Sequence, residues 1–262
     1  WYAAEDLSLA RAIFINRIDR SDADYDLAFA TLQERFGNKL GQVTIPMGSG
    51  DAFEGVIDVV HMKARHLEGG KPVVTDVPAA YAQAAEDARA QLTDLVAEAD
   101  DEIMMKYLEG EEITQGELEG LLAKAVAERV FVPVFTGSCV KEEGVISFMD
   151  AVVSWFPTMA DFGRIPLVNG EQLDISPDDD RPVAFAFKSL NDPQNGRLSF
   201  LKVLAGTLTP GIELTNARTR KSERLGHLYL MCGKDTTDVS SAAAGDIVVV
   251  PKLEAQTGDT LS

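Results

Sequence analysis

The sequence predicts an α/β portion followed by an all-β portion, and therefore a multi-domain protein of 262 residues. Up to Trp155, short apolar runs alternate with segments in which apolar residues recur every three or four positions, as strands and helices do in alternation. From Pro182 onward apolar residues recur at every second position, and no segment of helical spacing follows. The composition, 45% hydrophobic and 25% charged, is typical of soluble globular proteins, and no apolar run is long enough to span a membrane.

Two short, wholly apolar runs predict strands that are buried on both faces, as in a parallel sheet. Each is followed by a loop and then by a segment of helical spacing. The expected order is a helix end at Glu5–Arg11, a strand at Ala12–Ile15, a helix over Asp24–Phe36 ended by Gly37, a strand at Val130–Phe135, and a helix over Val145–Trp155 ended by Pro157.

Between these elements, the pattern of the segment from about Asn38 to Arg129 predicts strands followed by helices, as in a separate α+β unit. Strands are expected at Val43–Pro46 and Phe53–Met62, and a turn at Gly69–Pro72. One long helix is expected from Pro78 to Ile103, with an acidic outer face. A second helix is expected from Thr114, where Thr114 and Glu117 form a capping-box pattern.

A linker is expected over Thr158–Asp180, ending in Pro177-Asp-Asp-Asp180. The alternating segments after it predict a small closed β-barrel, with turns at sites such as Asn191-Asp-Pro193. After the strand that opens at Pro182, further strands are expected at Arg197–Leu204, Ile212–Ala217, Arg224–Met231 and Asp246–Val250.

The net charge of −18 is unevenly distributed. Residues 181–262 hold 10 Lys and Arg against 8 Asp and Glu, a net charge of +2, which leaves −20 for the first 180 residues. The later part therefore escapes the repulsion that an acidic protein exerts on nucleic acid. It also carries a basic cluster that could contact nucleic acid: Arg218, Arg220, Lys221 and Arg224. A solvated hairpin turn is the alternative interpretation of this cluster.

Asn16-Arg-Ile-Asp19 follows the first buried strand, and this pattern suits recognition of guanine. A carboxylate such as that of Asp19 accepts two hydrogen bonds from N1–H and N2–H₂ of the base, and Arg17 can lie over the ring. Asn16 is expected to tie the loop to its neighbours. The loop at Ser138-Cys139, after the second buried strand, is expected to donate to O6 from its backbone.

Taken alone, Asn-x-x-Asp is equally typical of a turn at the end of a strand. Two observations favour the guanine interpretation: a buried strand precedes the motif, and a second buried strand ends at Gly-Ser-Cys and leads into a helix.

At these positions the chain resembles bacterial elongation factor G, in order and over essentially its whole length. The matching runs are Ala12–Arg20, Gly55–Lys63, Tyr107–Glu112, Gly137–Lys141 with Gly144-Val145, Gly196–Val203, Leu208–Gly211, Ala244–Asp246 and Thr257–Leu261.

The resemblance implies a translational GTPase, of which this chain holds a part. It implies a partial P-loop GTPase domain at 1–37 and 130–157, an inserted subdomain at 38–129, a linker at 158–181 and a translation-factor β-barrel, domain II, at 182–262. Asn16, Arg17 and Asp19 match the guanine motif Asn-Lys-x-Asp, and Ser138 and Cys139 match its Ser-Ala partner. The cofactors implied for the full-length protein are GTP or GDP and Mg²⁺.

Some residues depart from the family pattern. Arg17 stands where Lys is usual and Cys139 where Ala is usual, and Leu228–Cys232 and Pro251–Leu253 replace more typical residues of the barrel. These departures favour an elongation factor G-like paralogue over the housekeeping translocase. A ribosome-protection or release-factor type of GTPase is an alternative, and the long insertion disfavours the ribosome-protection type. A non-catalytic module that binds protein and RNA is another.

No Gly-Lys-Ser or Gly-Lys-Thr occurs in the sequence, because Lys71 is followed by Pro72 and Lys234 by Asp235. The phosphate cradle and its magnesium hydroxyl are therefore missing, and we expect this stretch by itself to bind no nucleotide tightly and to hydrolyse none. The chain lacks an initiator Met, so a fragment is expected. His61, His66 and His227 do not converge with Cys139 and Cys232 at metal-ligand spacing, so neither a metal site nor catalysis by Cys139 is expected.

The partner expected by resemblance is the ribosome, through small-subunit rRNA at the barrel and the stalk protein at the inserted subdomain. The acidic face at Glu86, Asp94, Glu98 and Asp101 is a candidate for the stalk contact, and a solvated face is the alternative. Two cysteines far apart fit a reducing, cytoplasmic setting. The parent protein is expected to be monomeric. With only two sheet strands, the GTPase part is expected to have an exposed edge through which the fragment self-associates.

Overall fold

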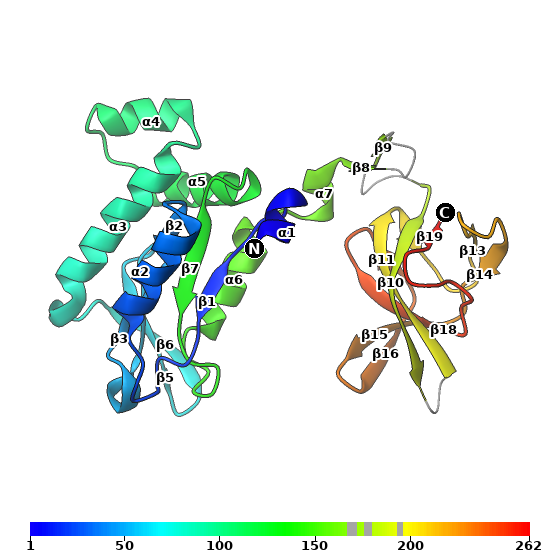
Figure 1. The fold of residues 1–262 in the computed structure, drawn as a ribbon, viewed down its shortest axis with the longest axis horizontal. Coiled ribbons are helices and arrows are strands. Elements are labelled where there is room, and N and C mark those ends of the chain that lie inside the picture. The colour runs from blue at the N-terminus through cyan, green and yellow to red at the C-terminus, as the bar shows by residue number, and fades with distance from the viewer. Residues whose placement is uncertain (167–171, 176–179, 193–195) are drawn as a thin grey trace. The chain divides into compact units, whose positions relative to one another are not determined.

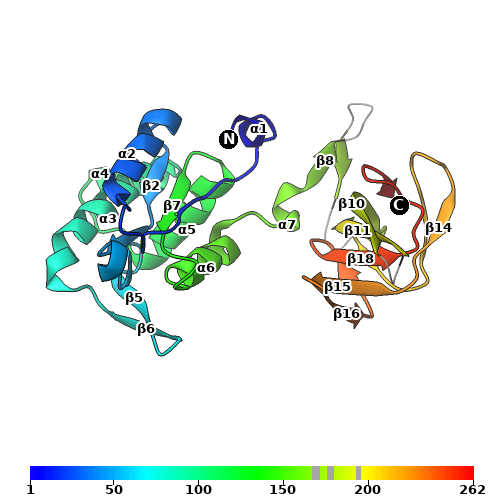
Figure 2. The ribbon, with the colours of Figure 1, turned by 60° about the horizontal axis from the view of Figure 1, so that its bottom comes forward.

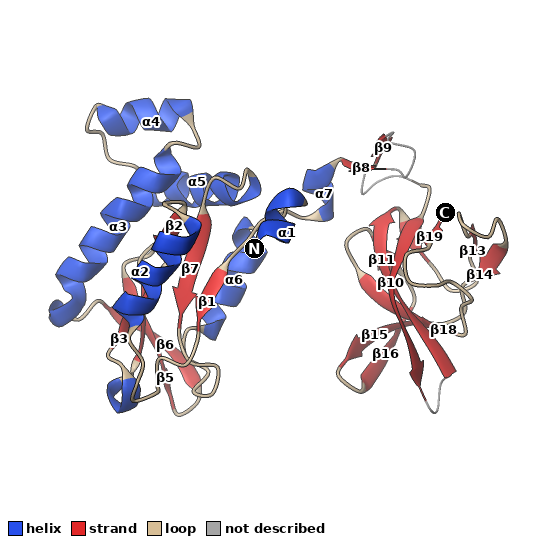
Figure 3. Cartoon of the chain, in the orientation of Figure 1, coloured by secondary structure: helices blue, strands red, loops and turns tan. Residues whose placement is uncertain are grey.

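The computed structural model describes residues 1–166, 172–175, 180–192 and 196–262, which form two units, Trp1–Pro157 and Thr158–Ser262 (Figure 1). In Figure 3 helices and strands mix in the first unit, whereas the second is built almost wholly of strands. The predicted order of an α/β portion and an all-β antiparallel portion is therefore confirmed. Among the residues described, no helix has the length and apolar character that crossing a membrane requires.

A parallel sheet lies at the centre of the first unit, in the order β1 (Ile13–Ile15), β7 (Val132–Thr136), β2 (Leu40–Gln42). β7 pairs in parallel with both neighbours. The expectation of only two sheet strands here was wrong, because Leu-Gly-Gln is too short and too polar to be recognised as a buried strand. Gly41 is needed in β2, since a Cβ there would lie 2.5 Å from the ring of Phe131.

The first unit also contains helices α1 (Tyr2–Asp6), α2 (Tyr25–Phe36) and α6 (Val145–Trp155). Helix α2 begins where the Asp24 side chain accepts the backbone N–H of Leu27, and it ends at Gly37, whose φ of 85° suits glycine. The predicted helix end at Glu5–Arg11 lies earlier in the structure, because α1 already ends at Asp6.

The segment 38–129, called the inserted segment below, begins with β2 of the parallel sheet and continues with an antiparallel sheet whose strands follow chain order: β3 (Thr44–Met47), β4 (Gly55–Asp58), β5 (Lys63–Glu68) and β6 (Lys71–Asp76). A 3₁₀ turn, η1 (Gly50–Ala52), joins β3 to β4. The strand predicted over Phe53–Met62 is confined to β4, and the start of β6 was mistaken for a turn because Pro72 follows Gly69-Gly70. Pro72 is tolerated because β6 is an edge strand, paired only with β5 among the described residues.

The long helix predicted from Pro78 to Ile103 is divided into η2 (Ala79–Tyr81), α3 (Ala82–Ala97) and α4 (Asp101–Leu108). Asp100 causes the break, because its backbone is extended and its side chain accepts the N–H groups of Glu102 and Ile103 at the start of α4. α5 (Gln115–Ala127) begins at the predicted capping box of Thr114 and Glu117. α3 packs on β2 and α5, and α5 packs on α6 (Figure 2).

One core runs through the first unit without respecting the sequence boundaries of the inserted segment. Phe135 on β7 and Ile57 on β4 are both fully buried members of this cluster, as are Leu92 on α3 and Leu122 on α5. Phe135 also stacks on Trp155 of α6, with ring centroids 6.3 Å apart. The inserted segment is thus packed against the sheet rather than tethered to it.

The second unit contains a six-stranded antiparallel sheet in the order β16-β15-β18-β11-β10-β19, counted over the described residues. The elements of this unit are α7 (Met159–Phe162), β8 (Arg164–Pro166), β9 (Gln172–Asp174), β10 (Val183–Asp192), β11 (Gly196–Ala205), β12 (Thr207–Leu208), β13 (Glu213–Thr215), β14 (Ser222–Arg224), β15 (Leu228–Cys232), β16 (Asp235–Val239), β17 (Ala242–Ala243), β18 (Ile247–Pro251) and β19 (Thr260–Leu261). The pairings do not by themselves establish that the sheet closes into a barrel.

The strand predicted over Arg224–Met231 is two strands, β14 and β15. Leu225 between them exchanges backbone hydrogen bonds with Gly211 and Ile212 instead, which breaks the run. The segment predicted as a linker contains α7, β8 and β9. Pro177-Asp178-Asp179, at the expected end of the linker, and Pro193, in a predicted turn, lie outside the described residues.

A polar network joins two loops of the second unit. Asp259, which is 3% exposed, forms a bidentate ion pair with Arg218 and accepts a hydrogen bond of 2.8 Å from Asn216 Nδ2. Asn216 Nδ2 also donates to Glu223, whose carboxylate accepts the backbone N–H groups of Glu254 and Ala255. The Arg218 guanidinium, together with Asn216, holds the pKa of Asp259 well below its ordinary value.

We predict that Asp259→Ala lowers the free energy of unfolding by about 2–3 kcal/mol, because it leaves buried donors of this network without an acceptor. Urea unfolding checks this, with the exposed Glu254→Ala as a matched acidic control that should be nearly neutral. Because the folded pKa of Asp259 is lower than its unfolded value, its contribution is complete above the unfolded pKa and is lost as the pH falls from there toward the folded pKa. A stability profile in acid that is the same with and without Asp259 would contradict this.

Candidate functional site

The carboxyl ends of β1 and β7 lie next to each other. The two strands are parallel, and Ile15, the last residue of β1, pairs with Thr136, the last of β7. The loops that follow, Asn16–Asp19 and Gly137–Cys139, therefore emerge at the same edge of the sheet (Figure 1). A separation of well over a hundred residues in sequence becomes direct contact in space.

Asn16 holds the two loops together. Its Oδ1 accepts the backbone N–H of Arg17 at 2.8 Å and that of Cys139 at 3.0 Å. Two backbone hydrogen bonds reinforce the junction, from Ile18 N–H to the Gly137 carbonyl at 3.2 Å and from Gly137 N–H to the Ile15 carbonyl at 3.1 Å. Ile18 itself is buried in the core at 2% exposed, which fixes the loop from below.

Asp19 has one carboxylate oxygen, Oδ1, that is buried and accepts no hydrogen bond from the described residues. A hydrogen bond from the Ser138 side chain, helped by the charges of Lys141 and Arg17, lowers the pKa of Asp19 from its ordinary value. The Asp19 side chain is thus ionised at neutral pH, and its Oδ1 remains available to accept a hydrogen bond. Buried polar atoms are normally paired, so this unpartnered oxygen is the strongest sign that the loop binds a ligand with a hydrogen-bond donor.

Arg17 is exposed, and its backbone φ of 67° places it in the left-handed region, which is uncommon for a residue other than glycine. This conformation is maintained by Asn16, whose side chain accepts the N–H of Arg17. The long side chain is free to extend along the loop and to cover a flat ring.

Ser138 is fully buried, and its backbone exchanges two hydrogen bonds with Glu143: Ser138 N–H donates at 3.0 Å, and the Ser138 carbonyl accepts from Glu143 N–H at 3.1 Å. Its Oγ also accepts the N–H of Lys141 at 3.2 Å. Cys139 is exposed, and its N–H is already engaged with Asn16. The predicted donation from this loop to O6 of guanine therefore requires that the Cys139 N–H is either shared between Asn16 and O6 or released from Asn16.

Glycine is required where the second loop closes on α6. A Cβ on Gly144, which has a φ of 79°, would lie 2.3 Å from the Thr136 carbonyl oxygen, and one on Gly137 would lie 2.2 Å from that of Glu143. The backbone segments approach so closely that any side chain would separate them. This packing sets the position of Ser138 between them.

Comparisons with known proteins identify the family of the chain. The model of the elongation factor Tu GTP binding domain family matches residues 1–158, and that of elongation factor G domain 2 matches residues 181–262. The chain belongs to the elongation factor G-like translational GTPases. The family resemblance found from the sequence motifs is thus confirmed.

Elongation factor G of Aquifex pyrophilus is 39% identical over 269 aligned residues, which cover 100% of this chain and 38% of that protein. A crystal structure of a Thermus thermophilus protein matches with a TM-score of 0.85 and 30% identity, covering 100% of this chain and 37% of that one. The chain therefore spans little more than a third of the length of these relatives.

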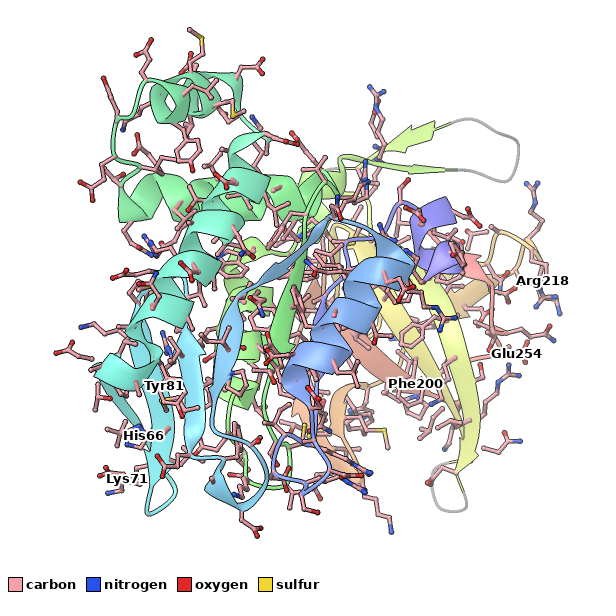
Figure 4. The ribbon with its side chains drawn as sticks, turned by 60° about the vertical axis from the view of Figure 1, so that its left-hand side comes forward. His66, Lys71, Tyr81, Phe200, Arg218 and Glu254 are labelled. Carbon is pink, nitrogen blue, oxygen red and sulfur yellow. The ribbon has the colours of Figure 1, made fainter. Side chains whose placement is uncertain are left out.

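The basic residues of domain II have different environments. Arg218 is bound to Asp259, so its charge is largely neutralised within the protein. Arg220, Lys221 and Arg224 are exposed, and among the described residues none of them forms an ion pair. Figure 4 labels Arg218 at the outer surface of the second unit.

Lys141 and Glu143 contact the site, although no role for either follows from the sequence. Lys141 lies within a run that matches the family, and nothing in the sequence distinguishes Glu143 from its exposed neighbour Glu142. Within the described ranges, no three His, Cys, Asp or Glu side chains are grouped so as to hold a metal ion.

We predict that Asn16→Ala loosens the contact between the two loops, because the N–H groups of Arg17 and Cys139 lose their acceptor. Amide hydrogen exchange at Cys139 should become at least about tenfold faster, which corresponds to the loss of about 1.4 kcal/mol of protection. Asn38→Ala, at an exposed turn after α2, is the matched control and should leave this rate unchanged. An unaltered Cys139 rate in Asn16→Ala would show that Asn16 does not hold the loops together.

Proposed function

We propose that this chain recognises the guanine base of GTP and GDP within a translational GTPase of the elongation factor G type, which acts on the ribosome. The observation that carries the proposal is the unpartnered Oδ1 of Asp19, in a loop held against Ser138 and Cys139. Guanine presents two adjacent donors, N1–H and N2–H₂, and an ionised carboxylate accepts both.

The remaining residues have supporting roles in this proposal. Arg17 covers the face of the base, Asn16 holds the two loops in register, and Ser138 orients Asp19. The backbone N–H of Cys139 donates to O6 when it is released from Asn16 or shared with it. Adenine presents an acceptor at N1 in place of a donor, so it would leave the Asp19 carboxylate unpaired.

The phosphates call for different residues. The sequence contains no Gly-Lys-Ser or Gly-Lys-Thr. We therefore propose that these 262 residues contribute base recognition, that GTP and its Mg²⁺ bind only to the full-length protein, and that this stretch by itself does not turn over GTP. When bound, Mg²⁺ would neutralise the charge that develops on the phosphates as GTP is hydrolysed.

The proposed domain division is a partial GTPase domain at 1–37 and 130–157, an inserted subdomain at 38–129, a linker at 158–181 and domain II at 182–262. Domain II is proposed to close into a barrel. Support comes from β13, where Thr215 exchanges backbone hydrogen bonds with Ser262, and from Ala217, whose N–H donates to Thr260 of β19. These bonds extend the six-stranded sheet toward closure.

The proposed partner is the ribosome, in the cytoplasm. Arg220, Lys221 and Arg224 would meet phosphates of small-subunit rRNA, with Arg218 holding the hairpin in shape. Glu86 and Asp94 on α3, Glu98 directly after it and Asp101 on α4 are exposed, which suits contact with the stalk protein. Because Arg17 and Cys139 depart from the family pattern, we favour an elongation factor G-like paralogue over the housekeeping translocase.

Asp19→Ala in the full-length protein is predicted to weaken GDP binding by about 100-fold or more, because both base donors lose their acceptor, and to leave ADP binding unchanged. Equilibrium titration with each nucleotide checks this, and Asp22→Ala, which removes only the surface pair with Arg20, serves as the control. The 262-residue stretch itself should release no phosphate from GTP. Guanine preference that survives in Asp19→Ala would refute the proposed site.

The triple substitution Arg220→Ala, Lys221→Ala and Arg224→Ala is predicted to weaken binding to ribosomal small subunits, because cations that meet phosphates are removed. The slope of log K against log salt concentration should fall by roughly 0.7–0.9 for each phosphate that is no longer neutralised. Lys234→Ala, which removes an exposed lysine from the β15–β16 turn, is the control. A slope identical to that of the unsubstituted protein would place the RNA contact elsewhere.

A further inference from the structure

The inserted segment contacts both loops of the proposed guanine site. From the β3–β4 connection, Gly50 N–H donates to the Ile18 carbonyl at 2.8 Å, and the Phe53 carbonyl accepts from Lys141 Nζ at 3.1 Å. From the β5–β6 hairpin, Leu67 N–H donates to Glu143 Oε1 at 2.8 Å. Two separate parts of the insertion therefore bind the residues that flank Asp19 and Ser138.

Glu143 joins the hairpin to the second loop of the site. The residue is 8% exposed, and its carboxylate reaches across to strand β5, 76 positions away in sequence. Its backbone N–H and carbonyl are at the same time both bonded to Ser138. Figure 4 marks the hairpin by His66 on β5 and Lys71 on β6.

These contacts form a continuous relay that ends at the base acceptor. Leu67 positions the Glu143 side chain, the Glu143 backbone positions Ser138, and Gly137, next to Ser138, accepts the N–H of Ile18, next to Asp19. The Ser138 side chain in addition lowers the pKa of Asp19. Lys141 adds a second route, because its N–H donates to Ser138 Oγ while its ammonium binds the Phe53 carbonyl and lies 5.8 Å from the centre of the Phe53 ring.

We propose that Glu143 is a positioning residue through which the inserted segment sets the geometry of the guanine site, with Lys141 as a weaker second anchor. The inference rests on the proposed function of Asp19 and Ser138. It gives the insertion a role in nucleotide selectivity that is separate from any partner it binds. A movement of the β5–β6 hairpin is transmitted to Ser138, and the alignment of the Asp19 carboxylate changes with it.

The physical cost of breaking the relay supports this role. Glu143→Ala leaves the Leu67 N–H without its acceptor and removes the buried group that holds residue 143 against the hairpin. The variant Glu143→Gln keeps an Oε1 acceptor at the same reach, so it preserves the contact while removing the charge. Comparing the two variants separates the hydrogen bond from general electrostatic effects.

The test measures dissociation constants of GDP and inosine diphosphate for the full-length protein. Inosine diphosphate lacks the 2-amino group. The dissociation constant of inosine diphosphate divided by that of GDP, called the ratio below, therefore reports how well Asp19 is aligned with the base. We expect Glu143→Ala to reduce this ratio by about tenfold, Glu143→Gln to retain it within about twofold, and Glu142→Ala, a substitution at the exposed neighbour, to leave it unchanged. Lys141→Met, which keeps most of the side-chain length, should reduce the ratio by about threefold.

A ratio retained in Glu143→Ala would overturn the inference, as would an equal loss in Glu143→Gln or Glu142→Ala. If Glu143→Ala does not fold, Lys141→Met decides. The proposed function is tested separately by the unsubstituted protein: equal affinity for GDP and ADP would overturn it, whereas clear preference for GDP with no effect of Glu143→Ala would overturn the inference alone. General destabilisation of the protein would weaken the binding of both nucleotides and leave the ratio of their dissociation constants unchanged.

Discussion

The parallel pairing of β1 with β7 is the constraint on which the rest of the site depends. Because parallel strands end at the same edge, the pairing of Ile15 with Thr136 places Asn16 and Gly137 side by side. Parallel neighbours require a crossover, and here the chain between β1 and β7 contains α2, β2 and the rest of the inserted segment. The two loops can then be joined by a single side chain, since one Asn16 oxygen accepts an N–H from each of them.

The insertion shares the core of the sheet, and this explains how it can hold the site. Phe131, just before β7, and Phe135 within it are packed with residues of β4, α3 and α5 in one cluster. A segment with its own independent core would move without consequence for the loops. With Leu67, Phe53 and Gly50 all bonded to residues around the loops, displacement of the inserted segment instead disturbs the loops that carry Asp19 and Ser138.

Domain II uses its charges in two ways. Arg218 is committed to Asp259 and so maintains the loop structure, whereas Arg220, Lys221 and Arg224 remain at the surface. Net charge counts all four alike, and for this reason the basic cluster looked uniform in the sequence. The burial of Asp259 and Asn216 is what separates the structural arginine from the others.

The sequence by itself determined the family, the order of an α/β part and an all-β part, and the identity of the loop residues, because apolar runs, capping patterns and family motifs are local signals. Tertiary structure alone decided the features that arise from contacts distant in sequence. Leu40–Gln42 became a strand because β7 offered it an edge, and the long helix broke because Asp100 capped a new one. Glu143 gained its position because Leu67, on a hairpin that no local pattern predicted, donates to it. A side chain's partner across 76 residues is set by packing, and packing leaves no local mark in the sequence.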